Sequence, residues 1–269
     1  EPEASGVLAP LGRILRRYVL KKHQGSYGVV CNTVSLLPSL RQRSVPTLIA
    51  CLRMGVPTSL TREYYGDEDF GHFTPIFEAL QKLLPQSKGA ARKLLEYLHL
   101  KHAPRGFRQD ILMTLGSVGP ADTACVMNAF VDFYTDDDWG ELYDRMFFAI
   151  KRIGSPAIPV LIEILKDPDE SRRSFAARLL GAYNDPDNRY ATETLEVAAR
   201  AAIPDLISAF VAGTGELKEA CAYALGTMGS HANDAVPALS DALQHQHSFI
   251  RKAAAEALAL IRPPSDEST

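Results

Sequence analysis

Apolar and polar residues follow a helical period along most of the chain, and one pattern recurs. Each copy is a short apolar stretch with proline as its third residue, found at 157–165, 202–210 and 235–243. Proline fits the first turn of a helix because its missing N–H would be unpaired there anyway. The apolar residues two and six positions later share one face. The pattern therefore predicts three short amphipathic helices that begin near their prolines.

A second pattern follows each of these stretches after a polar turn, at 173–181, 218–226 and 251–259. It opens on a basic residue, carries a pair of small residues in the middle and ends on leucine followed by glycine or alanine. The small pairs are Ala176-Ala177, Cys221-Ala222 and Ala254-Ala255. Small residues let neighbouring helices approach closely, so this pattern predicts second helices that pack against one another.

The second pattern extends towards the N-terminus, well copied at 107–116 and less well at 142–154, where Phe147-Phe148 flanks the place of the small pair. This gives five second helices. In the first-pattern segment that precedes 142–154, Asp122 stands near the position where the other copies have proline.

These paired patterns over 156–262 resemble the HEAT repeat family, in particular the short HEAT-like repeats named after the phycobilisome lyases. The resemblance implies an all-α fold, a right-handed α-solenoid (α-α superhelix) of HEAT-like helix pairs. It also implies that Asp167 in a turn pairs with Arg172 or Arg173 at the start of the next helix. The other two C-terminal repeats have Ala212 and His245 near that place and lack the acid.

The chain divides by pattern into three regions: 1–104, 105–262 and 263–269. The first is a helical region of divergent pairs, with helices expected at 7–23, 44–54, 73–84 and 88–100 and a long loop at 55–71. The second is the repeat array, in which the opening basic residues are 45 and then 33 positions apart, so 185–200 is an insertion. The third is expected to be a disordered tail.

The composition is that of a soluble protein, with 46% hydrophobic and 23% charged residues. No apolar run approaches the roughly 20 residues of a membrane span, and the first residues do not resemble a signal peptide. The four cysteines form no CxxC pair, which favours free thiols in a reducing compartment. We therefore expect a cytoplasmic protein.

Charge is distributed unevenly although the net charge is −3. Residues 1–62 carry a balance of +7 and residues 111–269 a balance of −10. The basic end offers candidate contacts to phosphate or to an acidic partner, whereas the acidic part repels nucleic acid. These candidate contacts are Arg13, Arg16, Arg17, Lys21 and Lys22.

Candidate catalytic chemistry is sparse. His99 and His102 lie three apart on an expected helix with Glu96 one turn earlier, but a metal needs three or four ligands. The deoxyhypusine hydroxylases, metalloenzymes on a related scaffold, carry repeated His-Glu pairs that this chain lacks. The acidic run 136–138 beside Trp139 reads as a solvated turn or a partner anchor. With no nucleophile set and no glycine-rich phosphate loop, we predict no metal, no cofactor and no enzymatic activity.

The resemblance further implies that the second helices line a concave surface, where the positions left free by the repeat pattern differ between repeats. We predict a noncatalytic scaffold that binds a protein partner there; the alternative is an enzyme subunit similar to a bilin lyase, or a nucleic-acid-binding repair protein that uses the basic end. Phe148, Arg178 and Tyr223 are the expected anchors. One row of free positions is Met113, Phe148, Arg178, Tyr223 and Glu256, and a neighbouring row is Gln109, Asp144, Ser174, Glu219 and Lys252.

Overall fold

The computed structural model describes residues 10, 13, 44–55, 74–98, 105–134, 143–183 and 197–262, and all regular structure within them is helical. The chain forms two compact units. Unit 1 comprises Glu1–Ala129 and Glu141–Ile153, and unit 2 comprises Phe130–Gly140 and Gly154–Thr269. The fold is the all-α solenoid of helix pairs that the sequence predicts, and each unit is described separately below.

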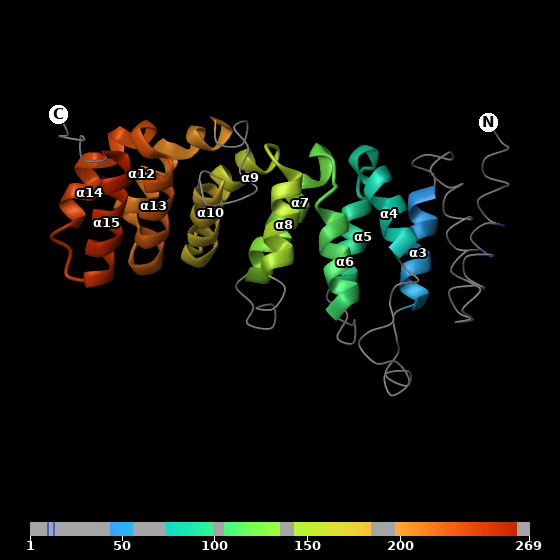
Figure 1. Ribbon diagram of the computed structural model, residues 1–269. Helices are drawn as coiled ribbons and strands as arrows, with labels where there is room; N and C mark the ends of the chain where they lie inside the picture. The colour runs from blue at the N-terminus through green and yellow to red at the C-terminus, as the bar shows by residue number, and fades with distance from the viewer. Residues whose placement is uncertain are drawn as a thin grey trace, which may run out of the picture. The chain divides into compact units, whose positions relative to one another are not determined.

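Unit 1 is built from helix pairs in which a first helix is followed by a second helix (Figure 1). The first helices α3 and α5 contact each other. Among the second helices, α6 contacts both α4 and α8. The helices are α3 (Val45–Gly55), α4 (Thr74–Leu83) with the 3-10 turn η4 (Leu84–Gln86), α5 (Ala90–Leu98), α6 (Arg105–Leu115), α7 (Pro120–Tyr134, of which residues 130–134 belong to unit 2) and α8 (Tyr143–Ile153).

Unit 2 repeats the same arrangement, and its most extensive helix contacts join the second helices α10, α13 and α15 side by side (Figure 1). The first helices are α9, α12 and α14. The bounds are α9 (Ala157–Ile164), α10 (Glu170–Ala182), η6 (Arg200–Ala202), α12 (Ile203–Ala212), α13 (Gly215–Thr227), η7 (Gly229–Ala235), α14 (Val236–Ala242) and α15 (Ser248–Ile261).

Proline marks the start of the first helices, as predicted. Pro204 and Pro237 are the second residues of α12 and α14, and Pro159 is the third residue of α9. In α7 the first residue is Pro120, and Asp122 is the third residue, the place that Pro159 has in α9. Proline needs no hydrogen-bond partner for its nitrogen at this position.

Close approach of the second helices depends on residues with little or no side chain. A Cβ atom on Gly181 would lie 2.8 Å from the Cα of Ala224, and one on Gly226 would lie 3.0 Å from the Cα of Ala257. In unit 1 a Cβ on Gly116 would lie 2.9 Å from the Cα of Ala149. The glycine that closes the second pattern therefore sets the spacing between adjacent repeats.

The turn between α9 and α10 contains the predicted acid–base pair. Arg172 Nε donates to Asp167 Oδ2 at 2.8 Å, which confirms the pairing expected from the resemblance. Burial raises the pKa of Asp167, but the hydrogen bond that its carboxylate accepts from the Asp169 N–H is the larger effect, and the pKa is lowered. The carboxylate thus also shapes the turn itself.

In unit 2 the basic residue near the start of each second helix has partners that the sequence analysis did not predict. They are backbone carbonyl groups at the end of the preceding first helix or in the turn that follows it. Arg173 donates to the carbonyl of Asp167 at 2.6 Å. Lys218 Nζ donates to Phe210 O at 2.5 Å, and Arg251 donates to His245 O at 2.7 Å. Positive charge is favourable at a helix C-terminus, where carbonyl groups are unpaired. The two repeats that lack the acid therefore still pair their basic residue.

Helices in the N-terminal region are confirmed where the structure describes it. α3, α4 and α5 account for those expected at 44–54, 73–84 and 88–100. No helix in the described part of the chain is long and apolar enough to cross a bilayer. Several expectations lie outside the described residues: the helix at 7–23 apart from residues 10 and 13, the 55–71 loop beyond Gly55, His99 and His102, Asp136–Trp139, residues 185–196 of the insertion and the tail at 263–269. The boundary at 104/105 stays a prediction.

Candidate functional site

The second helices of unit 2 carry a row of solvent-accessible side chains at repeat-equivalent positions. Arg178 on α10 is 36% exposed at its side chain, Tyr223 on α13 is 40% exposed and Glu256 on α15 is 64% exposed at its side chain. Their immediate neighbours in the pattern, Ala177 and Ala222, are completely buried. The structure therefore separates a uniform core from a surface whose chemistry changes from arginine to tyrosine to glutamate.

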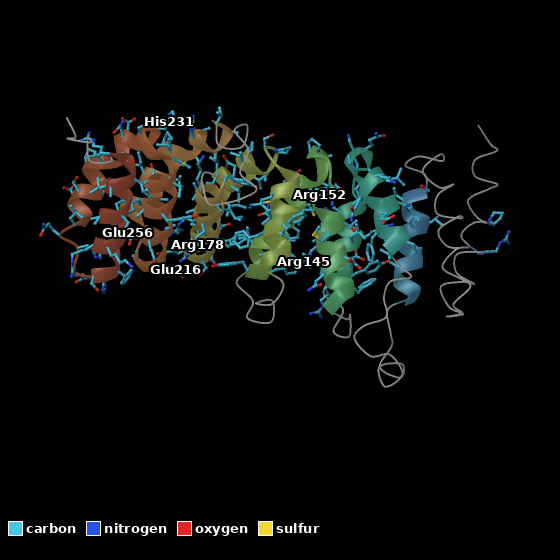
Figure 2. All side chains as sticks on the ribbon, viewed as in Figure 1. Arg145, Arg152, Arg178, Glu216, His231 and Glu256 are labelled. Atoms are coloured by element: carbon cyan, nitrogen blue, oxygen red, sulfur yellow. The ribbon has the colours of Figure 1, made fainter. Side chains whose placement is uncertain are left out.

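Arg178 joins the two predicted rows through ion pairs to the next repeat. Its Nη2 lies 3.1 Å from Glu216 Oε1 and 3.9 Å from Glu219 Oε2, both on α13. Figure 2 shows Arg178 and Glu216 on these neighbouring helices. Half-exposed ion pairs of this kind contribute little to stability, on the order of 0.5 kcal/mol each. Their effect here is to hold the guanidinium in one orientation.

Tyr223 rests on the backbone of the previous repeat. The Cε1 and Cδ1 atoms of its ring approach within 2.7 and 2.8 Å the place where a Cβ on Gly181 would stand. One face of the ring is therefore fixed against α10 while 40% of the residue remains exposed. An ordered, accessible tyrosine loses little conformational freedom on binding, which suits an interface anchor.

The last repeat contributes a charged pair within one helix. Lys252 Nζ lies 3.6 Å from Glu256 Oε1, one turn away along α15. Together with Arg178, Tyr223, Glu216 and Glu219, these side chains form what we call the second-helix surface of unit 2. It holds both charge signs beside one exposed aromatic ring, a composition typical of protein interfaces.

Ser174 does not belong to this surface, which corrects its place in the second predicted row. It is 2% exposed. The last turn of α7 covers this end of α10, because the rings of Tyr134 and Phe175 stack at 4.2 Å and Arg172 pairs with Asp132. The buried position explains why this repeat has a small serine where the next two repeats have Glu219 and Lys252.

In unit 1 the predicted residues Gln109 and Met113 on α6 and Phe148 on α8 are half-buried. The side chain of Asp144 lies outside the described residues. Beside Gln109, burial raises the pKa of Asp110, and the positive charge of Arg145 opposes this rise. The structure thus places Gln109, Met113 and Phe148 on second helices of unit 1, each partly accessible to solvent.

The remaining predicted contacts are described in part. Arg13 is exposed, and Arg16, Arg17, Lys21 and Lys22 lie outside the described residues. Among the described residues there is no group of three or more His, Cys, Asp or Glu side chains that could hold a metal ion. Burial raises the pKa of the Cys221 thiol to about 12, so this thiol is protonated at neutral pH.

Two carboxylates that cap helices of other repeats were missed by the sequence analysis. Glu170 at the start of α10 accepts hydrogen bonds from Thr214, the residue before α13. Asp122 on α7 accepts from the N–H groups of Gly89 and Ala91 at the start of α5, at 2.8 and 3.2 Å. Ordinary capping motifs join residues three apart, so no local signal in the sequence points to partners 31 or more positions away.

The fold defines an α-helical repeat protein, and comparison with known proteins gives the family of its C-terminal part. The family model described as HEAT repeats matches residues 203–268, which cover α12 to α15. These residues therefore form HEAT repeats, as the sequence pattern predicts. The phycobilisome-lyase subtype stays a prediction. No curated protein matches the chain.

Several solved structures are similar to this chain at low sequence identity. A designed armadillo repeat protein in complex with the peptide (KR)4 has 14% identity and a TM-score of 0.38, covering 81% of this chain and 99% of its own. A computationally designed armadillo repeat protein for modular peptide recognition has 14% identity and a TM-score of 0.36, with 81% and 100% covered. Human deoxyhypusine hydroxylase in complex with glycerol has 14% identity and a TM-score of 0.34, with 97% and 99% covered.

Proposed function

We propose that this protein is a noncatalytic scaffold that binds a protein segment on the second-helix surface of unit 2. The single observation that carries the proposal is the contrast between buried and exposed repeat positions. Three positions of the pattern are buried and identical in α10 and α13, namely Ala177 and Ala222, Leu180 and Leu225, and Gly181 and Gly226. The exposed row is instead Arg178, Tyr223 and Glu256. A surface that served only to remain solvated would not need an ordered aromatic ring at its centre.

Tyr223 and Arg178 are the anchors of the proposed interface. The tyrosine ring offers an apolar face with a hydroxyl at its end, and the guanidinium offers several donors in one plane. The ion pairs of Arg178 with Glu216 and Glu219 restrict the conformations of its guanidinium. A partner that supplies a carboxylate or a carbonyl group therefore binds a donor that loses little conformational entropy.

The test compares affinity capture by the wild-type chain with capture by the double variant Arg178→Ala/Tyr223→Ala. Partners that bind this surface, identified by mass spectrometry of the captured proteins, should be lost from the variant, because truncating an interface anchor costs about 2 kcal/mol or more. Helical circular dichroism and the melting temperature should stay close to wild type, since both side chains are at least one third exposed.

The matched control is Lys166→Ala/Val211→Ser, which removes a cation and an apolar side chain at other exposed positions of unit 2. These residues are 54% exposed at the side chain and 62% exposed, respectively. The control should capture the same proteins as the wild type. Equal capture by the anchor variant and the wild type, with both folded, contradicts the proposal.

A further inference from the structure

A cavity of about 280 Å³ opens between the first helices α3 and α5 of unit 1, and none of its lining residues belongs to a second helix. It lies where both helices begin, so their N-terminal ends point at the same space. The hydrogen bond from the Tyr97 hydroxyl to Ile49 O, 3.0 Å long, ties the two helices together one to two turns further along. The lining residues are Val45, Pro46, Ile49, Ser87, Lys88, Gly89, Ala90 and Lys93.

The lining combines an apolar wall with two positive charges. Val45, Ile49 and Ala90 supply the wall, and each is at most 7% exposed. Lys88 and Lys93 are exposed, and within the described part of the chain neither of them takes part in an ion pair or hydrogen bond. Lysines that form no ion pair leave positive charge available to an incoming anion.

Asp122 limits how much negative charge the cavity can accept. Its carboxylate is 7% exposed and accepts the N–H groups of Gly89 and Ala91, directly behind the cavity lining. One buried negative charge beside two exposed positive charges leaves a net charge of +1. This balance suits a single carboxylate better than a phosphate dianion.

The volume limits the apolar part of the ligand. Pockets for drug-sized molecules and cofactors occupy roughly 300 to 1,000 Å³ and enclose most of the ligand. A cavity of about 280 Å³ that is open to solvent is at the lower edge of this range, which fits one aliphatic or aromatic side chain and its backbone.

We propose that this cavity binds a protein segment in which an apolar side chain stands next to an aspartate or glutamate. The apolar side chain enters between Val45, Ile49 and Ala90, and the carboxylate pairs with Lys88 and Lys93. The site is formed by residues of unit 1 and shares none with the second-helix surface of unit 2. The scaffold thereby gains a second binding site with its own charge preference.

The probe is a dye-labelled decapeptide in which pairs of leucine alternate with pairs of glutamate. It is titrated with the 269-residue chain, and binding is followed by fluorescence anisotropy. Two analogues replace every glutamate with glutamine or every leucine with serine. The parent peptide should bind most tightly, and both analogues should bind more weakly. An equal affinity for the glutamine analogue overturns the proposal, and so does an equal affinity for the serine analogue.

Charge variants of the protein test the site independently of changes in the peptide. Lys88→Gln/Lys93→Gln should weaken binding about fivefold, as expected from two partly screened ion pairs. Asp122→Asn should strengthen it, because a negative charge behind the cavity is removed while one acceptor oxygen stays. The control Lys82→Gln/Arg92→Gln removes the same charge from exposed positions of unit 1 that do not line the cavity. Equal weakening by the control overturns the proposal.

Location is checked by ¹H–¹⁵N spectra of the wild-type chain. Saturating peptide should shift the amide signals of Gly89 and Ala90, and unshifted signals at millimolar peptide overturn the proposal. A loss of binding in the Arg178→Ala/Tyr223→Ala variant would place the peptide on the second-helix surface and also overturn it. Binding of free 4-methylpentanoate as tightly as the peptide would assign the cavity to small carboxylic acids instead of a protein segment.

Discussion

Glu170 caps a helix in the next repeat through Thr214. Its Oε1 accepts the Thr214 N–H at 3.0 Å and the Thr214 hydroxyl at 2.7 Å. Thr214 is the residue before α13 and makes no side-chain cap of its own. The carboxylate that a helix N-terminus needs is therefore supplied from α10, and the two second helices are joined by polar contacts as well as by core packing.

This contact predicts a specific acid sensitivity. The hydrogen bond from the Thr214 hydroxyl is the largest of the effects that lower the pKa of Glu170 from its ordinary 4.5. The lowered pKa means that Glu170 stabilises the fold above about pH 4.5, and that this stabilisation is lost as pH falls through the folded-state value. Urea unfolding at pH 7 and pH 3 should show a smaller acid-induced loss for Glu170→Gln than for wild type.

Asp234→Asn is the control for this comparison, because Asp234 is exposed and forms no hydrogen bond or ion pair among the described residues. Its acid-induced loss of stability should match that of the wild type. If Glu170→Gln also matches the wild type, the Thr214 contact does not contribute to folding in solution.

The carbonyl-capping lysine should matter more than its exposed neighbours. Lys218→Met removes donors to Phe210 O and Val211 O, at 2.5 and 3.1 Å, and a cation 4.9 Å from the Phe210 ring centre. We expect a loss of about 1 kcal/mol in the free energy of unfolding, the size of a partly exposed charge-assisted hydrogen bond. Lys252→Met, on an exposed face of α15, should change it by less than about 0.5 kcal/mol.

A glycine substitution tests the spacing of the second helices. A Cβ on Gly181 would stand 2.7 to 2.8 Å from the Tyr223 ring and the Ala224 Cα, and the backbone of α13 cannot yield locally. Gly181→Ala should therefore lower the unfolding free energy by about 1 to 3 kcal/mol, as overpacking does. Gly106→Ala, where no atom lies within 4 Å of the new Cβ, should be neutral or stabilising. Equal stability of the two variants would contradict the packing shown by the structure.

Asp122 should be among the most sensitive polar residues of unit 1. Asp122→Ala leaves the N–H groups of Gly89 and Ala91 without their acceptor in a region that is mostly buried. The expected loss is about 1 to 2 kcal/mol, the range for losing a helix cap. Thermal melting followed by circular dichroism measures it, with Glu78→Ala on the exposed side of α4 as the control.

The helix pairs and their prolines could be predicted because they follow from local patterns. Pro204 and Pro237 mark helix starts in any tertiary setting, and the small pairs leave room for a neighbour that must be another repeat. The exposure of Arg178, Tyr223 and Glu256 follows from the same periodicity. Repeats make such inference reliable because each one meets nearly the same environment.

Contacts between residues that are distant along the chain and have no equivalent in other repeats could not be predicted from the sequence. Ser174 was assigned to a surface row by its position in the pattern, yet it is buried, and the last turn of α7 packs on its neighbour Phe175. The cavity between α3 and α5 depends on the relative placement of two first helices, which no periodicity encodes. The partner carbonyls of Arg173, Lys218 and Arg251 were missed because a backbone acceptor leaves no residue type to search for.

Capping across repeats has a consequence for the order in which the protein folds during synthesis. The first N–H groups of α5 lack their acceptor until Asp122 is synthesised, 31 residues after Ala91. At elongation rates of about 5 to 20 residues per second, α5 therefore spends on the order of seconds without its cap. During that interval the first amide groups of α5 donate hydrogen bonds to water in place of Asp122. The nascent helix pair therefore remains accessible to chaperones until α7 has been synthesised.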